Sequence, residues 1–437
     1  MSQIELQPVK GTRDFYPEDM RTRQWLFGLW RATARSFGFE EYDACVLEHT
    51  ELYIRKAGDE ITGQLYEFRD KGDRHVALRP ELTPSLARMI MAKGAALPLP
   101  VRWFAIPQCF RYEDTQRGRK REHFQWNMDI IGLPSVAAEA ELMAAQVHFL
   151  RQTGLNLEPG TPDIVWRVSN RQVLGHFLQA MDIIGEQFSA VCVVIDKRDK
   201  IGDAATAAEL AKVGVTADNA QAILRLLDVR GLEALAQHVP ADNPGLLALT
   251  ELLALAESLG FAHLVRIDLS VIRGLSYYTG TVWEVFDDTG TLKRAIAGGG
   301  RYDKLCEMLG GQAVPMVGFG FGDVVILDIL AERNLLPVLG RGIEDVVFPM
   351  SAQEFACANR VAAGLRRQGR SVSVDYSGRR FKYVIERAEA DGATRLFIIG
   401  SNEVKDGVVV ERLLGGLKSG DKSAPKQERK VPLAELV

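Results

Sequence analysis

Hydrophobic and polar residues alternate regularly between Glu122 and Ile131. Because successive side chains of a β-strand point to opposite faces, this pattern predicts a strand with one apolar and one polar face. The apolar face carries Phe124, Trp126, Met128 and Ile130, and the polar face carries His123, Gln125, Asn127 and Asp129. The polar face either borders water, as in an ordinary half-buried strand, or binds a ligand. Its amide and carboxylate groups favour a binding surface.

The patterning up to about residue 340 predicts a mainly antiparallel sheet with helices around it. Helical periodicity is expected over 17–37 and 136–153, after Pro84, and almost without interruption from 171 to 264. Strand character is expected at 40–48, 60–80, 101–113, 264–271 and 281–287. This order predicts an α+β fold, with a helical module inserted into a sheet of six or seven strands, rather than a βαβ array.

The composition changes at 339–343, and a regular alternation of strands and helices follows. Strands are expected at 345–348, 371–375 and 395–399, with helices at 353–368 and 380–390. Ser351 and Glu354 have the spacing of a capping box. This part predicts a separate α/β domain of roughly 95 residues. The lysine-bearing segment 417–430 is either a solvated hairpin loop or a weak candidate for RNA contact.

Charge and cysteine usage narrow the class of protein. Lys and Arg number 53 against 57 Asp and Glu, for a net charge of −4, which excludes a globally basic coat for nucleic acid but leaves room for local basic patches. The five cysteines form no C-x-x-C pair, so we expect neither a disulfide framework nor a zinc ribbon. The most apolar helical stretch, 246–264, contains charged residues, and no signal-peptide core is visible. A cytoplasmic protein without a membrane span is expected.

Basic residues gather just before the alternating strand. Arg111 and Glu113 share a face of the preceding strand, and the loop 114–121 carries Arg117, Arg119, Lys120 and Arg121. Guanidinium groups bind phosphate in a bidentate manner. The loop and the polar face together predict a site for a phosphate-bearing ligand and a small polar molecule.

Three further segments contain glycine. Arg273-Gly274 before Tyr277-Tyr278 is either a plain turn or a turn with two ligand-binding hydroxyls. Gly298–Arg301 is either a flexible loop or a place where backbone approaches a ligand closely. Gly318–Gly322 does not have dinucleotide-binding spacing. The scattered histidines make a catalytic metal cage unexpected, so no protein-bound metal site is predicted.

Four stretches, in this order, resemble the signatures of histidyl-tRNA synthetases, which are class II aminoacyl-tRNA synthetases. They are Lys10–Phe15 with Pro17, Arg79–Thr83, the motif 2 segment Phe110–Asp129, and Arg273–Thr279. The resemblance covers essentially the whole chain. It implies a catalytic core at 1–170 and 265–338, a helical insertion domain at 171–264 and an anticodon-binding domain at 343–437.

The resemblance also implies a role for each matching residue. Arg111 and Arg273 would be the catalytic residues on the α-phosphate of ATP, with the remaining nucleotide contacts from Glu113 to adenine and Arg119 to the distal phosphates. The histidine ligands would be Glu81, Thr83, Gln125, Asp129, Tyr277 and Tyr278. Mg²⁺ with ATP, tRNA(His) as partner and a homodimer are further implications.

The sequence departs from the family pattern at several positions. Asp129 replaces a usual glutamate, and Val325 stands where many members have an ATP-binding arginine, for which Arg119 or Arg121 is expected to compensate. Cys45 occupies the place of the motif 1 proline. Asp114-Thr115 replaces a common Arg-Pro in the motif 2 loop, which bears on recognition of the acceptor end.

Two other classes of protein are alternatives. One is a non-catalytic paralogue, the regulatory subunit of ATP phosphoribosyltransferase, which generally lacks the C-terminal domain and loses the motif 2 and Arg-Gly-Leu residues. The other is an RNA-sensing module without ligase activity. This chain keeps both the C-terminal domain and the motif 2 and Arg-Gly-Leu residues, which favours the ligase.

Overall fold

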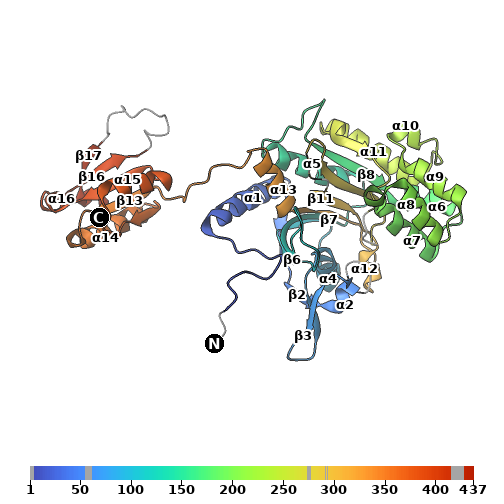
Figure 1. Ribbon diagram of the computed structural model, residues 1–437, viewed down its shortest axis with the longest axis horizontal. Helices are drawn as coiled ribbons and strands as arrows, with labels where there is room; N and C mark the ends of the chain where they lie inside the picture. The colour runs from blue at the N-terminus through green and yellow to red at the C-terminus, as the bar shows by residue number, and fades with distance from the viewer. Residues whose placement is uncertain (1–3, 55–61, 273–276, 291, 293, 415–427) are drawn as a thin grey trace. The chain divides into compact units, whose positions relative to one another are not determined.

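The computed structural model describes residues 4–54, 62–272, 277–290, 292, 294–414 and 428–437. The chain divides into two compact units, Met1–Leu336 and Pro337–Val437, which are described separately below (Figure 1). No described helix combines the length and apolar character needed to span a bilayer.

The first unit is built on a sheet that has nine strands among the described residues. Its order is β1 (Glu40–Glu41), β5 (Val101–Ala105), β7 (Glu122–Ile131), β12 (Met316–Gly322), β11 (Ala297–Arg301), β10 (Thr281–Asp287), β8 (Ile164–Asn170) and β9 (Val265–Ile267), with β6 (Gln108–Phe110) paired to β7. Pairing is antiparallel except for β1 with β5 and β8 with β9. The expected number of six or seven strands was too low. Strands β8, β11 and β12 lie where no strand was expected, and the glycines of β11 and β12 leave little alternation of side chains to indicate one.

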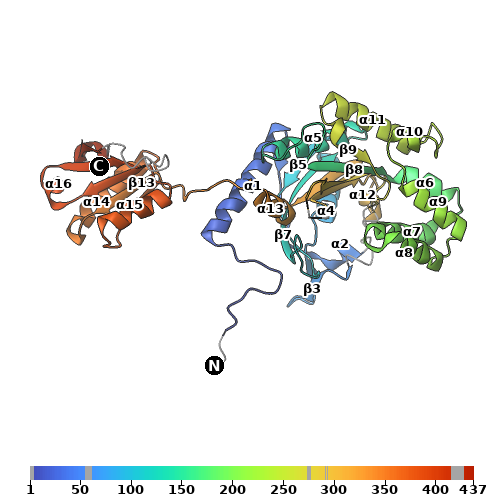
Figure 2. The ribbon, with the colours of Figure 1, turned by 45° about the horizontal axis from the view of Figure 1, so that its top comes forward.

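One face of this sheet packs against helices α1 (Pro17–Ser36), α5 (Ala137–Arg151) and α13 (Asp323–Glu332) (Figure 2). The Trp30 ring of α1 lies 6.0 Å from the Trp126 ring of β7, and Phe149 of α5 lies 5.5 Å from Trp126. All three side chains are fully buried. The apolar face predicted for residues 122–131 is therefore the core face, and the polar face is turned to the other side of the sheet.

The stretch after β8 is helical, as expected. Its helices are α6 (Arg171–Gln179), α7 (Gly185–Asp196), α8 (Arg198–Lys212), α9 (Ala217–Leu227), α10 (Leu232–Leu235) and α11 (Pro244–Ser258), followed by the 3₁₀ turn η2 (Ala262–Leu264). Asn170, Thr216 and Asn243 cap α6, α9 and α11 through their side chains. Helix α11 packs on α5 and β8, so the module continues the core of the sheet.

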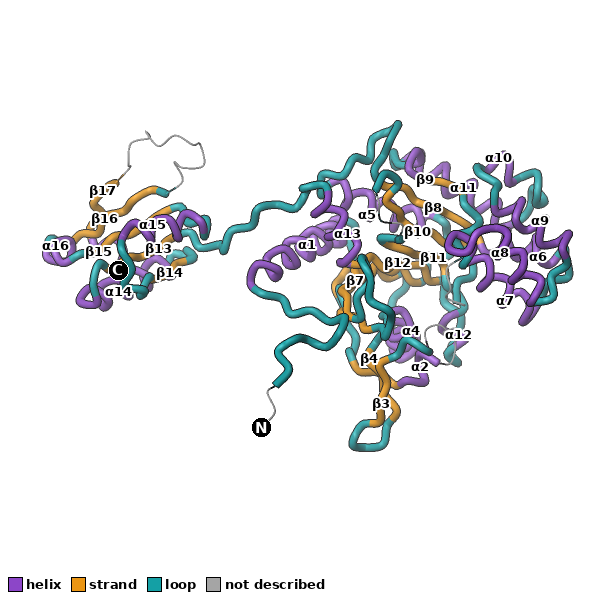
Figure 3. The backbone as a smooth tube through the Cα atoms, in the orientation of Figure 1, coloured by secondary structure: helices purple, strands orange, loops and turns teal. Residues whose placement is uncertain are grey.

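A smaller sheet lies beside the polar face of the large one. It has the order β2 (Leu47–His49), β4 (His75–Leu78) and β3 (Tyr66–Arg69), with α2 (Thr50–Ile54), α4 (Thr83–Lys93), η1 (Gly94–Ala96) and α12 (Leu305–Met308) near it (Figure 3). The single strand expected over 101–113 was wrong. It divides into β5 and β6 around Pro107, which has no N–H to donate to a ladder.

The second unit is an α/β sheet of order β14 (Val372–Val374), β13 (Asp345–Pro349), β15 (Arg395–Ile399), β16 (Val408–Leu413) and β17 (Glu428–Pro432). Helices are η3 (Ala352–Glu354), α14 (Phe355–Arg367), α15 (Phe381–Ala390), α16 (Ser401–Lys405) and α17 (Leu433–Leu436). The Ser351–Glu354 capping box is confirmed. Strands β16 and β17 were not predicted, and most of the segment 417–430 lies outside the described residues.

Candidate active site

The polar face of β7 does not border bulk water. Asn127 and Asp129 are 4% and 2% exposed, and His123 and Gln125 are half-buried. Space for these side chains comes from the neighbouring strand β12, which has glycine at alternate positions. A Cβ at Gly318 would lie 1.9 Å from the Asp129 carboxylate, and one at Gly320 would lie 2.4 Å from the Gln125 amide. The glycines of β12 thus leave room for the polar side chains of β7.

Two cavities adjoin on this face. The larger encloses about 170 Å³ and the smaller about 30 Å³. Four residues line both of them, namely Arg111, Gln125, Gly298 and Gly320. The guanidinium of Arg111 and the amide of Gln125 therefore stand at the junction between the cavities.

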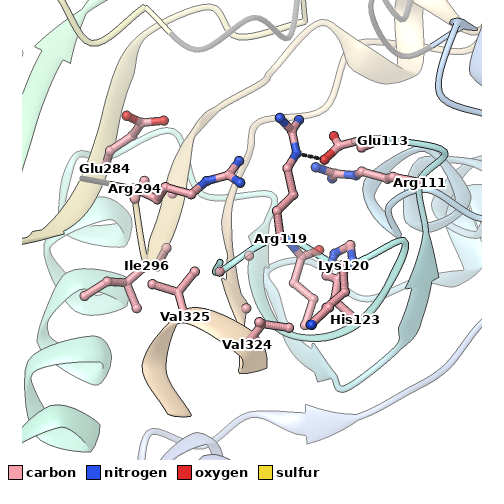
Figure 4. Close-up of a pocket in the computed structure, with 17 residues that line it drawn as sticks. Arg111, Glu113, Arg119, Lys120, His123, Glu284, Arg294, Ile296, Val324 and Val325 are labelled. Carbon is pink, nitrogen blue, oxygen red and sulfur yellow. Dashed lines mark hydrogen bonds and ion pairs between the residues drawn. The ribbon is translucent and has the colours of Figure 1, made fainter. Parts of the chain in front are cut away.

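The larger cavity is rich in arginine (Figure 4). Arg111, Glu113 and Arg119 come from the segment between β6 and β7, where Arg119 forms an ion pair with Glu113. The Nε of Arg111 donates to the Pro80 carbonyl at 2.9 Å, which fixes that side chain to the start of the α4 segment. Arg294 points toward this group from the opposite wall, and Ile296, Val324 and Val325 form an apolar wall. Such a cavity suits a ligand with a flat apolar part and several negative charges.

The smaller cavity is lined by polar and aromatic groups. The hydroxyl of Tyr277 donates to Glu81 at 2.9 Å, and Thr83 begins helix α4 beside them. Tyr278 and Tyr302 add two further rings, with the Tyr277 and Tyr278 ring centres 4.9 Å apart. A carboxylate, an amide and several hydroxyls in so small a space suit a compact polar molecule.

Asp129 lies behind the smaller cavity and accepts a hydrogen bond from the Tyr302 hydroxyl. Burial raises the pKa of Asp129 to about 7, and the Tyr302 hydrogen bond opposes this rise. At neutral pH this carboxyl group therefore lies between its protonated and ionised forms. A ligand that donates an N–H to it would stabilise the ionised form.

His123 lines the larger cavity as a neutral ring. Burial, together with the charges of Arg111 and Arg13, lowers its pKa to about 3. The imidazole is therefore uncharged at physiological pH and presents an aromatic surface rather than a cation.

The N-terminal segment anchors the site. Arg13 donates to Glu122 at 3.3 Å and to Asp323 at 3.0 Å, so it joins the first residue of β7 to the first residue of α13. Asp323 in turn accepts from the Phe124 backbone N–H at 2.9 Å. This network explains physically why the Lys10–Phe15 stretch belongs with the site although its own side chains line neither cavity.

All of the predicted site residues that the structure describes lie at or beside the two cavities. Glu81, Thr83, Gln125, Tyr277 and Tyr278 line the smaller cavity, Arg111, Glu113 and Arg119 line the larger one, and Asp129 stands behind the smaller. Arg273 lies outside the described residues. Arg121 stacks on Tyr112, with its guanidinium 3.9 Å from the ring centre, and does not line either cavity.

Tyr302 and Arg294 line the cavities but were not predicted as site residues. Tyr302 directly follows Gly298–Arg301, which form strand β11, so the interpretation of these glycines as a flexible loop was wrong. The sequence did contain an indication of Tyr302, because this tyrosine closely follows glycines that allow a ligand to approach the backbone. No sequence pattern marked Arg294.

An antiparallel sheet that carries an arginine-rich cavity beside a small polar pocket fits the catalytic unit of an aminoacyl-tRNA ligase. The family model for histidyl-tRNA synthetase matches residues 11–322, and that for an anticodon binding domain matches 345–437. The chain belongs to the histidyl-tRNA synthetase family.

Similar proteins agree with this assignment. A chloroplastic/mitochondrial histidine–tRNA ligase of Arabidopsis thaliana is 45% identical over 94% of this chain and 84% of its own length. A histidine–tRNA ligase of Halobacterium salinarum is 38% identical over 93% of this chain and 94% of its own length. The fold also matches the crystal structure of histidyl-tRNA synthetase from Nostoc sp. PCC 7120, with a TM-score of 0.79, 24% identity and 99% coverage of both chains.

Proposed function

We propose that the two adjoining cavities carry out the histidine–tRNA ligase reaction of this chain, with ATP in the larger cavity and L-histidine in the smaller. The histidine–tRNA ligase activity itself follows from the family and from relatives similar over nearly the whole chain. The observation that carries the placement is the junction of the cavities at Arg111 and Gln125. At this junction the histidine carboxylate would meet the α-phosphate.

The nucleotide contacts follow from the lining of the larger cavity. Arg111 would bind the α-phosphate, together with Arg273, which lies outside the described residues. Glu113 would accept from the adenine amino group and Arg119 would bind the distal phosphates, so their mutual ion pair has to rearrange when ATP enters. Mg²⁺ would be held mainly by the ATP phosphates, since this ion usually binds through phosphates and one or two carboxylates. Glu284, which lines the same cavity, would be the carboxylate ligand.

The histidine contacts follow from the smaller cavity. Glu81 and Thr83 would bind the ammonium group, Gln125 the amino-acid backbone, and Asp129 with Tyr278 the imidazole, while Tyr277 lines the pocket. At about 30 Å³ against about 170 Å³, this cavity is the more confined of the two, as suits the more compact substrate.

The first step needs no general base, because a carboxylate with a pKa of roughly 3.5 is ionised at pH 7. Its oxygen forms a bond to the α-phosphorus, the bond from that phosphorus to the bridging oxygen breaks, and pyrophosphate leaves. The arginines align the two reactants and stabilise the negative charge that develops on the phosphoryl oxygens. Bound Mg²⁺ would add positive charge at the leaving pyrophosphate.

In the second step, the terminal ribose hydroxyl of tRNA(His) attacks the histidyl carbonyl and AMP leaves. The second unit, matched by an anticodon binding domain, would hold the other end of the tRNA. A homodimer and a cytoplasmic location stay predictions. The Arabidopsis relative is named as chloroplastic/mitochondrial, so compartment varies among similar proteins.

The decisive experiment is histidine-dependent ATP–pyrophosphate exchange by the pure protein with Mg²⁺, followed by charging of tRNA(His). We expect exchange with L-histidine and none with the other amino acids, and an Arg111→Ala variant should lose it by about 10²-fold or more. Absence of exchange in the wild type would favour the non-catalytic paralogue. Exchange that survives Arg111→Ala unchanged would instead reject the placement of the α-phosphate.

A further inference from the structure

Arg294 is a cation in the larger cavity that no sequence motif marks. It lies between β10 and β11, shortly before β11, and faces the Arg111–Arg119 side of the cavity (Figure 4). Its Nη1 atom is buried and has no hydrogen-bond partner among the described residues. Burial, together with the nearby charge of Arg111, lowers its pKa. A half-buried guanidinium with a buried, unpartnered nitrogen is costly beside other guanidinium groups unless an anion is added.

Packing alone does not account for this arginine. The Cδ of Arg294 lies near Gly118 of the loop between β6 and β7, beside Leu292 and Val325. An unbranched apolar side chain could fill that space without burying a charge. Helix α13 contributes only Val324 and Val325 to the cavity, so this helix supplies no cation to it.

The position of Arg294 indicates which part of the nucleotide it meets. Arg111 lines both cavities and so marks the junction where the α-phosphorus is attacked. Arg294 lines the larger cavity alone. It therefore stands on the side of the cavity away from the amino acid, where the leaving group would lie.

We propose that Arg294 binds the β- and γ-phosphates of ATP, and hence the pyrophosphate product, in place of a cation from α13. This inference rests on the proposed location of ATP. It also revises the expectation that Arg119 or Arg121 alone makes up for Val325, because Arg121 is stacked on Tyr112 away from the cavity.

The test compares ligands with and without the distal phosphates. Dissociation constants of ATP, AMP, L-histidine and histidyl-sulfamoyl-adenosine are measured for the wild type, Arg294→Ala and Arg294→Lys, together with the KM for pyrophosphate in exchange. Arg117→Ala is the matched control, because Arg117 lies in the same region, pairs with Glu332 and lines neither cavity. Thermal unfolding checks that each variant is folded.

We expect Arg294→Ala to weaken ATP binding and raise the pyrophosphate KM by about tenfold or more, the usual range for a lost hydrogen bond to a charged group. Binding of AMP, histidine and the adenylate analogue should change less than about twofold, and Arg294→Lys should fall between. Unchanged ATP binding, or an equal loss for ATP and AMP, would overturn the assignment. A wild type without histidine-dependent exchange would reject the proposed function, while the ATP–AMP comparison would still decide on Arg294.

Discussion

At the scale of single residues, Asp129 is the group whose chemistry depends most on its surroundings. The neighbouring residues in the sequence do not determine its ionisation. Burial beside the smaller cavity does, because it raises the pKa of the Asp129 carboxyl group to about 7. The Tyr302 hydroxyl occupies one carboxylate oxygen, which leaves the other for a ligand. An ionised Asp129 can accept the N–H of an imidazole, whereas the protonated form offers a donor there instead.

This leads to a pH prediction for histidine binding. Since the empty pocket has a carboxyl pKa of about 7, the ionised fraction falls as pH is lowered through this value, and histidine affinity should fall by about tenfold between pH 8 and pH 6 from this group. Free histidine titrates in the same range, and it does so equally for an Asp129→Asn variant. The difference in the pH slopes of the two proteins, measured by calorimetry, therefore isolates Asp129. Identical slopes would contradict the assignment.

At the scale of elements, the site depends on the fit between β7 and β12. The alternate glycines of β12 are not needed for a turn, since the strand is regular, but a side chain at Gly318 would collide with Asp129. The pairing of a polar strand with a glycine strand is therefore what gives the pocket its depth.

Gly318→Ala should accordingly disable histidine binding. We expect the KM for histidine in exchange to rise by about tenfold or more, because the Asp129 carboxylate must leave its position, while the dissociation constant of ATP changes little. Gly28→Ala is the control, since nothing lies within 4 Å of a Cβ at Gly28 in helix α1. A Gly318→Ala enzyme with the wild-type KM for histidine would show that Asp129 does not contact the substrate.

The anchoring of β7 and α13 by Arg13 gives a second prediction at this scale. Arg13→Ala leaves the buried carboxylates Glu122 and Asp323 without their cation, so the free energy of unfolding should fall by about 3 kcal/mol. Denaturant titration measures this change. Arg21→Ala, which removes a pair 3.8 Å apart between a partly exposed arginine and the exposed Glu18, should cost less than about 1 kcal/mol. Equal effects of the two substitutions would contradict the anchoring role.

The elements also show what a sequence can and cannot predict. Residues 122–131 carried their own evidence, because alternation over ten positions determines both the strand and its buried face. Strands β11 and β12 were not predicted, because their glycines leave no alternation of apolar and polar side chains to detect. Arg294 could not be assigned either, because its place at the larger cavity depends on how β10, β11 and β12 pair.

At the scale of the whole molecule, the two compact units divide the work. In the proposed mechanism, activation uses residues of the first unit only, and the match to an anticodon binding domain covers the second. Residues 1–336 on their own should therefore keep histidine-dependent ATP–pyrophosphate exchange within about threefold of the full chain, while charging of tRNA(His) falls by about 10²-fold or more, because the contacts with the far end of the tRNA are lost. Parallel assays of exchange and charging measure this. Equal losses in both assays would mean that the second unit is needed for activation itself.

In the proposed mechanism, histidine and ATP occupy adjoining cavities that meet at Arg111 and Gln125. A crystal structure with bound histidyl-sulfamoyl-adenosine tests it most directly. We predict the imidazole against Asp129 and Tyr278, the adenosine in the arginine-rich cavity, and the sulfamoyl group within hydrogen-bonding distance of Arg111. An analogue bound elsewhere, or bound with its imidazole in the larger cavity, would contradict the account.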